Sequence, residues 1–103
     1  MAIYVDLDGT LAEYGTWQGP EHIGKPIPAM MDRVRTWLRE GKTVKIFTAR
    51  ASIPEQIPPI ESWLAQQGLH QCEVTAIKGF DGVEFWDDRA VTVEMNTGRI
   101  LTK

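Results

Sequence analysis

Two aspartates separated by one residue follow an apolar segment at the start of the chain. The segment reads Ala-Ile-Tyr-Val over residues 2–5, and Asp6-Leu7-Asp8-Gly9-Thr10 comes directly after it. If Val5 ends a buried strand, the two-residue period of the strand and the turn after it bring Asp6 and Asp8 to one small site. Two carboxylates that close repel unless a cation lies between them, and oxygen ligands favour Mg²⁺. The pattern predicts metal-assisted chemistry at a strand end; the simpler alternative is a polar loop after an N-terminal strand.

Three later apolar segments also end in polar residues, which are Thr48, Lys78 and the pair Asp87-Asp88. A phosphate monoester is a dianion, so an aspartate can attack it only when a metal ion and a cationic side chain offset the charge. The acidic residues would hold Mg²⁺ and Lys78 would face the phosphate. Each group also has a structural alternative: a strand-end hydroxyl, a solvated lysine, and an acidic cap of a helix or turn.

The elements that must position these groups alternate between strand and helix. Residues 27–40 carry apolar side chains at helical spacing and are followed by Gly41, a typical C-terminal cap. A second helix is expected after Pro54 and stops at Gly68, with its start left open by Pro58-Pro59. Strands are expected at 2–5, 43–47, 73–77 and 83–86, and a hairpin at 91–101. This order predicts an α/β fold, a three-layer Rossmann-like arrangement with a mainly parallel central sheet that binds ligands at the carboxyl ends of its strands.

In type and order, these groups resemble the four motifs of the haloacid dehalogenase-like hydrolase superfamily, and the resemblance extends over residues 3–93. It implies that Asp6 is a nucleophile that becomes an aspartyl phosphate and that Asp8 is the general acid and base. It also implies that Thr48 hydrogen-bonds a phosphoryl oxygen, that Lys78 neutralises phosphate charge and that Mg²⁺ is the cofactor. The metal ligands implied are Asp6, the backbone carbonyl of Asp8, Asp87, and Asp88 directly or through water.

The chain departs from the superfamily pattern in two places. Only residues 79–82 separate Lys78 from the next strand, which is too few for a crossover helix and leaves Lys45 as the alternative cation. Neither of the intervals that carry a cap domain in larger members has room for one. A capless site is open to water. Either the substrate is bulky, such as a nucleic-acid end or a phosphoprotein, or a second copy of the chain closes the site.

Residues beside the motifs are expected to contact the substrate. Segment 11–25 is rich in glycine and is expected to form a loop or short hairpin over the site, in which an aromatic side chain either stacks on a base or sugar or packs the loop. Arg50 and Arg89 each follow a motif and either grip a leaving group or pair with nearby carboxylates, with pairing favoured. The candidate substrate contacts are Gly9, Thr10, Tyr14, Trp17 and Arg50.

Composition limits the classes of protein that fit. With 103 residues and 43% hydrophobic content, residues 1–103 are expected to form one domain with its own core. The net charge of −3 and the lack of a basic run disfavour a broad nucleic-acid surface. Cys72 is the only cysteine, so no disulfide can form within the chain, and no apolar stretch approaches the ~20 residues that span a bilayer. A cytoplasmic protein without membrane association is expected.

Three functions compete at this stage. The first is a Mg²⁺-dependent phosphatase that acts through Asp6 on a nucleotide, a sugar phosphate, a polynucleotide 3′-phosphate or a phosphoprotein. The second is a non-catalytic phosphate-binding or metal-binding module on the same scaffold; it would be indicated by a missing nucleophile or acid, and neither is missing. The third is a receiver domain, which needs an acidic acceptor at the end of a later strand, and no acidic residue ends segment 44–47.

Overall fold

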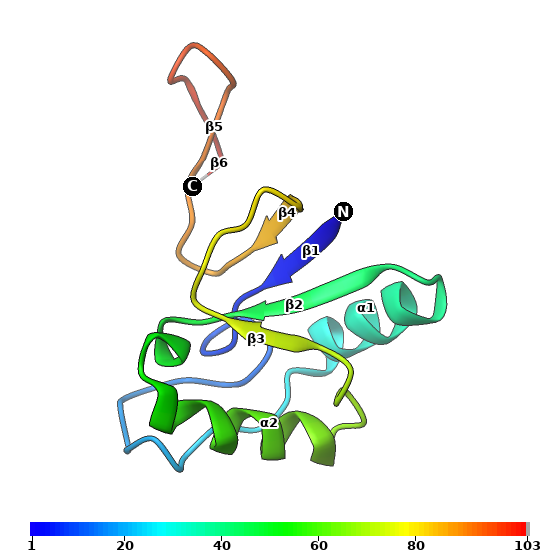
Figure 1. The fold of residues 1–103 in the computed structure, drawn as a ribbon. Coiled ribbons are helices and arrows are strands. Elements are labelled where there is room, and N and C mark those ends of the chain that lie inside the picture. The colour runs from blue at the N-terminus through cyan, green and yellow to red at the C-terminus, as the bar shows by residue number, and fades with distance from the viewer. Residues whose placement is uncertain (103) are drawn as a thin grey trace.

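A four-stranded parallel sheet forms the centre of the computed structural model, which describes residues 1–102 (Figure 1). The strands are β1 (Ala2–Val5), β2 (Thr43–Phe47), β3 (Glu73–Thr75) and β4 (Gly82–Trp86). They lie in the order β3-β2-β1-β4, and each neighbouring pair is parallel. The predicted α/β class and parallel sheet are therefore confirmed, and the order places β1, with the aspartate motif after it, between β2 and β4.

Two α-helices connect the first three strands, α1 (Pro28–Arg39) and α2 (Ile57–Gln66). Both end near a glycine in the left-handed region, Gly41 at φ +81° and Gly68 at φ +74°, a conformation that costs a residue without Cβ little. The helix predicted after Pro54 is preceded by two short 3₁₀ turns, η1 (Ala49–Ser52) and η2 (Pro54–Gln56). Pro58 and Pro59 are accepted because they lie in the first turn of α2, where an N–H has no partner within the helix.

The hydrophobic core lies on one face of the sheet. Ile3 is in register with Val44, and Val5 is in register with Ile46, so these four side chains share one face. They belong to one buried cluster with Met30, Met31 and Val34 of α1 and Ile60, Trp63 and Leu64 of α2. Both helices therefore cover the same face of the sheet, in agreement with their placement in Figure 1.

The opposite face carries aromatic side chains and the connection from β3 to β4. Tyr4, which is only 2% exposed, packs against Phe85 with ring centroids 4.9 Å apart. Its hydroxyl donates to Asp81 at 2.5 Å and accepts from the backbone N–H of Gly79 at 3.1 Å. Segment 76–81 thus crosses this face in bends and turns, because six residues are too few for a crossover helix. The expected third layer is not formed within residues 1–102, where the sheet has helices on one face only.

Two further segments complete the described structure. Between β1 and α1, residues 11–25 form the expected loop, here called the flap, whose base is held by hydrogen bonds from the Glu13 N–H to the Lys25 carbonyl and from the Ile27 N–H to the Leu11 carbonyl. At the other end of the chain, β5 (Thr92–Val93) and β6 (Ile100–Thr102) form the predicted hairpin, which extends away from the sheet (Figure 1). No helix within residues 1–102 has the length and apolar character needed to cross a membrane.

Candidate functional site

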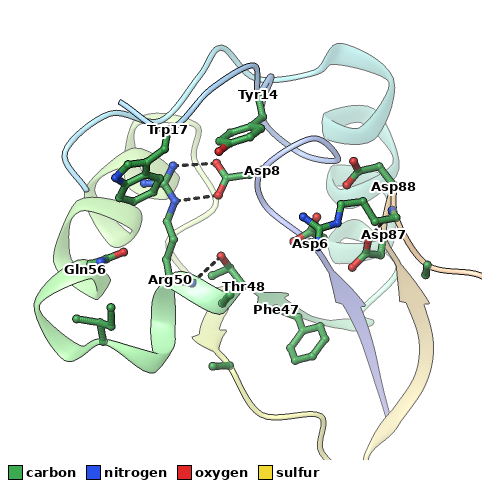
Figure 2. A pocket seen from close by; sticks show the side chains of 15 residues that line it. Asp6, Asp8, Tyr14, Trp17, Phe47, Thr48, Arg50, Gln56, Asp87 and Asp88 are labelled. Atoms are coloured by element: carbon green, nitrogen blue, oxygen red, sulfur yellow. Dashed lines mark hydrogen bonds and ion pairs between the residues drawn. The ribbon is translucent and has the colours of Figure 1, made fainter. Parts of the chain in front are cut away.

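A cavity of about 800 Å³ lies at the carboxyl ends of the central strands (Figure 2). Parallel strands end at the same edge of a sheet, so side chains that follow β1, β2 and β4 meet there although they are far apart in sequence. The cavity is lined by eight of the candidate site residues, which are Asp6, Asp8, Tyr14, Trp17, Thr48, Arg50, Asp87 and Asp88. The residues that the sequence places at strand ends, Asp6, Asp8, Thr48, Asp87 and Asp88, thus lie in one cavity together with two flap aromatics and Arg50.

Three carboxylates in this cavity lie close enough to share one cation. Asp6, Asp87 and Asp88 each offer an oxygen atom, and these atoms are all within 4.8 Å of one another. Opposite oxygen ligands are about 4 Å apart around Mg²⁺ and up to about 5 Å apart around Ca²⁺. Adjacent oxygen ligands of Mg²⁺ are only about 3 Å apart, and at most one pair among three ligands can be opposite, so the cluster would contract around the ion. Its all-oxygen donor set suits such an ion.

The Asp-Gly-Thr turn after β1 holds this cluster together. The Thr10 hydroxyl, which is buried, donates to Asp88 Oδ1 at 3.0 Å and lies 3.4 Å from Asp6 Oδ2. The backbone N–H of Asp88 donates back to the Thr10 hydroxyl at 3.0 Å. Gly9 has φ +89°, and a Cβ atom there would lie 2.6 Å from Asp88 Oδ2. Gly9 and Thr10 were expected as substrate contacts, but they do not line the cavity. Both contact Asp88, and the Thr10 hydroxyl also lies near Asp6.

Burial and the neighbouring carboxylates raise the pKa of Asp6 to about 7. The main cause is burial, followed by the negative charge of Asp87 and a hydrogen bond with Asp88. Asp8 does not share this environment, because it faces Arg50, whereas Asp6 faces the acidic pair. A cation bound between these carboxylates would remove the repulsion that makes Asp6 hard to ionise.

This raised pKa predicts that Asp6→Asn stabilises the metal-free protein at high pH. Because the folded-state pKa is above the ordinary value of 3.8, the Asp6 contribution favours folding at acid pH and is lost as the pH rises toward 7. The carboxamide carries no charge at any pH. In EDTA at pH 8 we expect the free energy of unfolding of the variant to exceed that of the wild type by about 1–2 kcal/mol, or roughly 4–10 °C in Tm; the figure is reduced because Asp6 is partly exposed. At pH 4 the two proteins should have the same Tm. A stability difference that does not change with pH would contradict a raised pKa at Asp6.

Asp8 points away from the acidic cluster and pairs with Arg50. The guanidinium Nε donates to Asp8 Oδ2 at 2.8 Å and a terminal nitrogen donates to Oδ1 at 2.9 Å, which is a bidentate pair (Figure 2). Arg50 is only 7% exposed. The structure thus realises the pairing that the sequence favoured for Arg50, and it assigns the Asp8 side chain to this pair rather than to the group of carboxylates around Asp6.

Arg50 also fastens the flap over the cavity. It donates to the backbone carbonyls of Pro20 at 3.4 Å and His22 at 3.0 Å. The Trp17 ring stacks on the guanidinium group at 4.7 Å, as Figure 2 shows. One buried arginine therefore links Asp8, two flap carbonyls and a flap aromatic. No sequence pattern indicates this link, because the carbonyl groups of a glycine-rich loop have no side-chain signature.

Thr48 lies at the end of β2 and lines the cavity. Its side chain is buried, and its oxygen accepts from the backbone N–H of Arg50 at 3.3 Å, which caps η1. The structural and the functional interpretations of this residue therefore coexist: the oxygen accepts within the turn, and the hydroxyl hydrogen is available to a ligand.

Lys78 does not line the cavity, contrary to the expectation from the sequence. Its ammonium group lies 5.0 Å from the centre of the Phe85 ring, on the face of the sheet that the helices leave uncovered. Lys45, the alternative cation, is on the same face and pairs with Asp81 at 2.7 Å. The reason is the short β3–β4 connection, because the chain leaves β3 at Thr75 and turns at once across the sheet. Ala76 therefore still lines the cavity, whereas Lys78 lies beyond it on the other face of the sheet.

The cavity also includes Ile53 and Gln56 from the 3₁₀ turns and Ala90 after β4, which the sequence did not single out. Arg89, for which gripping a leaving group was one of two alternatives, lines it as well. Proximity to a strand-end motif was the signal available for Arg89. For Gln56 no signal existed, because its place depends on how η1 and η2 bend the chain before α2 begins.

Comparisons with protein-family models, with curated proteins and with solved structures find no match to this chain.

Proposed function

We propose that this chain is a Mg²⁺-dependent phosphomonoesterase that acts through an aspartyl phosphate on Asp6. The observation that carries the proposal is the clustering of Asp6 with Asp87 and Asp88 at the carboxyl end of the sheet, in the same cavity as Asp8. A lone carboxylate there would be unremarkable. Four carboxylates around one cavity, with one of them given a pKa of about 7, are an arrangement that suits charge-offset chemistry.

In the first step an Asp6 oxygen attacks phosphorus, and the bond from phosphorus to the leaving oxygen breaks. The leaving oxygen takes a proton from Asp8. In the second step water attacks the same phosphorus and gives a proton to Asp8, the Asp6–phosphorus bond breaks, and inorganic phosphate leaves. The Arg50 pair uses one lone pair on each Asp8 oxygen, so further lone pairs remain for this proton transfer.

Asp6, Asp87 and Asp88 would hold the magnesium ion, which when bound supplies positive charge for the phosphoryl oxygens and for the attacking carboxylate. The Thr48 hydroxyl, at the end of β2, would donate a hydrogen bond to a phosphoryl oxygen. Both contributions matter because a phosphate dianion entering this cavity meets a field that is otherwise dominated by carboxylates.

The substrate class that fits is a phosphorylated small molecule or a phosphorylated polynucleotide end. The cavity volume lies within the range of small-molecule sites, and Tyr14 and Trp17 on its flap are each 50% exposed. Only the flap, rather than a cap domain, lies between β1 and α1. The flap covers a small substrate, or a larger substrate covers the site itself, or a second copy of the chain covers it. Light scattering with and without substrate measures the oligomeric state and so detects a second copy.

One observation favours the alternative of a non-catalytic metal-binding or phosphate-binding module. Lys78, the cation that the resemblance assigns to the phosphate, lies outside the cavity. A module that has lost this contact would bind Mg²⁺ without turnover.

The deciding experiment measures release of phosphate from a generic aryl phosphate by the wild type. We expect turnover with millimolar Mg²⁺, none in excess EDTA, and recovery when Mg²⁺ is restored. Mg²⁺ should also raise Tm, because it binds the folded chain and relieves the repulsion at Asp6. A rise in Tm without turnover on aryl phosphates, nucleotides, sugar phosphates or 3′-phosphorylated oligonucleotides would favour the module instead.

A further inference from the structure

The cavity presents a phosphate group with more carboxylates than cations. The carboxylates are Asp6, Asp8, Asp87 and Asp88, and the cationic residues that line the cavity are Arg50 and Arg89. With a single divalent ion at the acidic cluster, the phosphate dianion would still face the other carboxylates, so a side-chain cation that contacts the phosphoryl oxygens would stabilise it further. The identity of that cation is therefore a structural question about this cavity.

Neither lysine near the sheet is available for this contact. Lys78 lies against the Phe85 ring, and Lys45 is held between Asp81 at 2.7 Å and Glu73 at 3.8 Å. Both are on the face of the sheet that carries Tyr4 and Phe85, and neither lines the cavity. For Lys78 to reach a phosphate beside Asp6, segment 76–81 would have to leave its contacts with Tyr4.

Arg50 lines the cavity but is already committed. A guanidinium group has five N–H donors, and four hydrogen bonds from Arg50 go to the two Asp8 oxygens and to the carbonyls of Pro20 and His22. The group is nearly fully buried, and Trp17 covers it. One N–H is left, so a phosphate could take two hydrogen bonds from Arg50 only by displacing Asp8 or a flap carbonyl.

Arg89 is the remaining cation. It follows Asp87 and Asp88 directly and lines the same cavity. Its backbone N–H donates to Asp87 Oδ1 at 2.7 Å, which fixes the start of the residue beside the acidic cluster. Its side chain is exposed and forms no ion pair with any of residues 1–102.

We propose that Arg89 binds the phosphoryl group of the substrate, in the role that the sequence pattern assigned to Lys78. The inference rests on the proposed function and names the residue that makes its site complete. A guanidinium group suits this task, because its planar fork donates two parallel hydrogen bonds to two phosphate oxygens. Placing the cation directly after the acidic pair also explains how the chain dispenses with a helix between β3 and β4: the cation no longer has to come from that connection.

Binding of inorganic phosphate, the reaction product, tests the proposal without relying on turnover. Calorimetry in saturating Mg²⁺ would compare the wild type with Arg89→Gln, Arg89→Lys and the matched control Lys78→Gln. We expect Arg89→Gln to weaken phosphate binding by about 10-fold to 100-fold, Arg89→Lys to restore part of it, and Lys78→Gln to stay within about 2-fold. The KM for the aryl phosphate should rise most in Arg89→Gln, less in Arg89→Lys and hardly at all in Lys78→Gln.

Two further measurements separate phosphate binding from structural effects. The Tm of Arg89→Gln should equal that of the wild type, because the side chain has no ion pair to lose, and Mg²⁺ binding without phosphate should not weaken. A loss of phosphate affinity in Lys78→Gln equal to that in Arg89→Gln, or an unchanged affinity in Arg89→Gln, would overturn the role of Arg89 while leaving a phosphatase in place. A wild type that neither binds phosphate nor hydrolyses an aryl phosphate would overturn the proposed function itself, and the role of Arg89 with it.

Discussion

Asp6→Asn is expected to reduce turnover of an aryl phosphate by at least about 10³-fold while the fold is retained. A carboxamide oxygen is neutral and a poor nucleophile, and the side chain keeps almost the same volume. The variant also loses a ligand for the cation. Because Asp6 is the carboxylate at which burial and the charge of Asp87 concentrate the repulsion, its loss should leave the metal-free protein at least as stable as the wild type at pH 8. An inactive Asp6→Asn variant with a higher Tm than the wild type would show that activity is lost through the missing carboxylate and not through unfolding.

The matched control is Asp32→Asn, which changes an exposed aspartate on α1 in the same way and should leave kcat and KM unchanged. Acid quenching during turnover of a ³²P-labelled substrate should trap label on the wild-type chain and none on Asp6→Asn. Wild-type turnover by Asp6→Asn would eliminate the aspartyl-phosphate mechanism. Trapped label on another residue would locate the nucleophile elsewhere in the cavity.

The positions of the acidic groups could be predicted from the sequence because they depend on a local rule. A short apolar strand such as Ala2–Val5 is buried, and the first polar residues after it emerge at the carboxyl edge of the parallel sheet. The same rule located Thr48 after β2 and Asp87 after β4. Asp6, Thr48 and Asp87 directly follow their strands, so little conformational freedom separates the pattern from their positions. Asp8 is three residues past Val5, but a tight turn, in which the N–H groups of Thr10, Leu11 and Ala12 donate to the Leu7 carbonyl, keeps it at the same edge.

The prediction that Lys78 lies at the site was wrong. β3 ends at Thr75, three residues before Lys78. Over that distance the direction of the chain is decided by tertiary contacts, here the hydrogen bonds of Tyr4 with Gly79 and Asp81. The expectation of a third layer was not met for a related reason. Six residues from β3 to β4 cannot form a helix, and the sequence already showed this shortage, but the expectation of a three-layer fold followed the general α/β pattern instead.

Arg50→Lys and Arg50→Ala are expected to lower both stability and activity, although Arg50 touches no reacting atom in the proposed mechanism. A lysine cannot donate to both Asp8 oxygens and to the flap carbonyls at once. Breaking a buried ion pair costs about 3–5 kcal/mol, and the partial exposure of Asp8, whose side chain is 21% exposed, reduces the expected loss to about 2–3 kcal/mol. Urea unfolding measures it, with Arg39→Ala on the surface of α1 as the control that should lose little.

A double-mutant cycle with Asp8→Asn identifies the origin of that loss. If the bidentate pair is responsible, Arg50→Ala should cost about 1–2 kcal/mol less in the Asp8→Asn background than in the wild type. The remainder belongs to the Pro20 and His22 carbonyls, which lose a buried donor whichever residue stands at position 8. Amide hydrogen exchange across residues 14–24 should therefore accelerate in Arg50→Ala and much less in Asp8→Asn. Additive costs together with unchanged exchange in the flap would mean that Arg50 merely fills space; coupling with faster exchange would mean that one side chain both orients Asp8 and keeps the flap over the cavity.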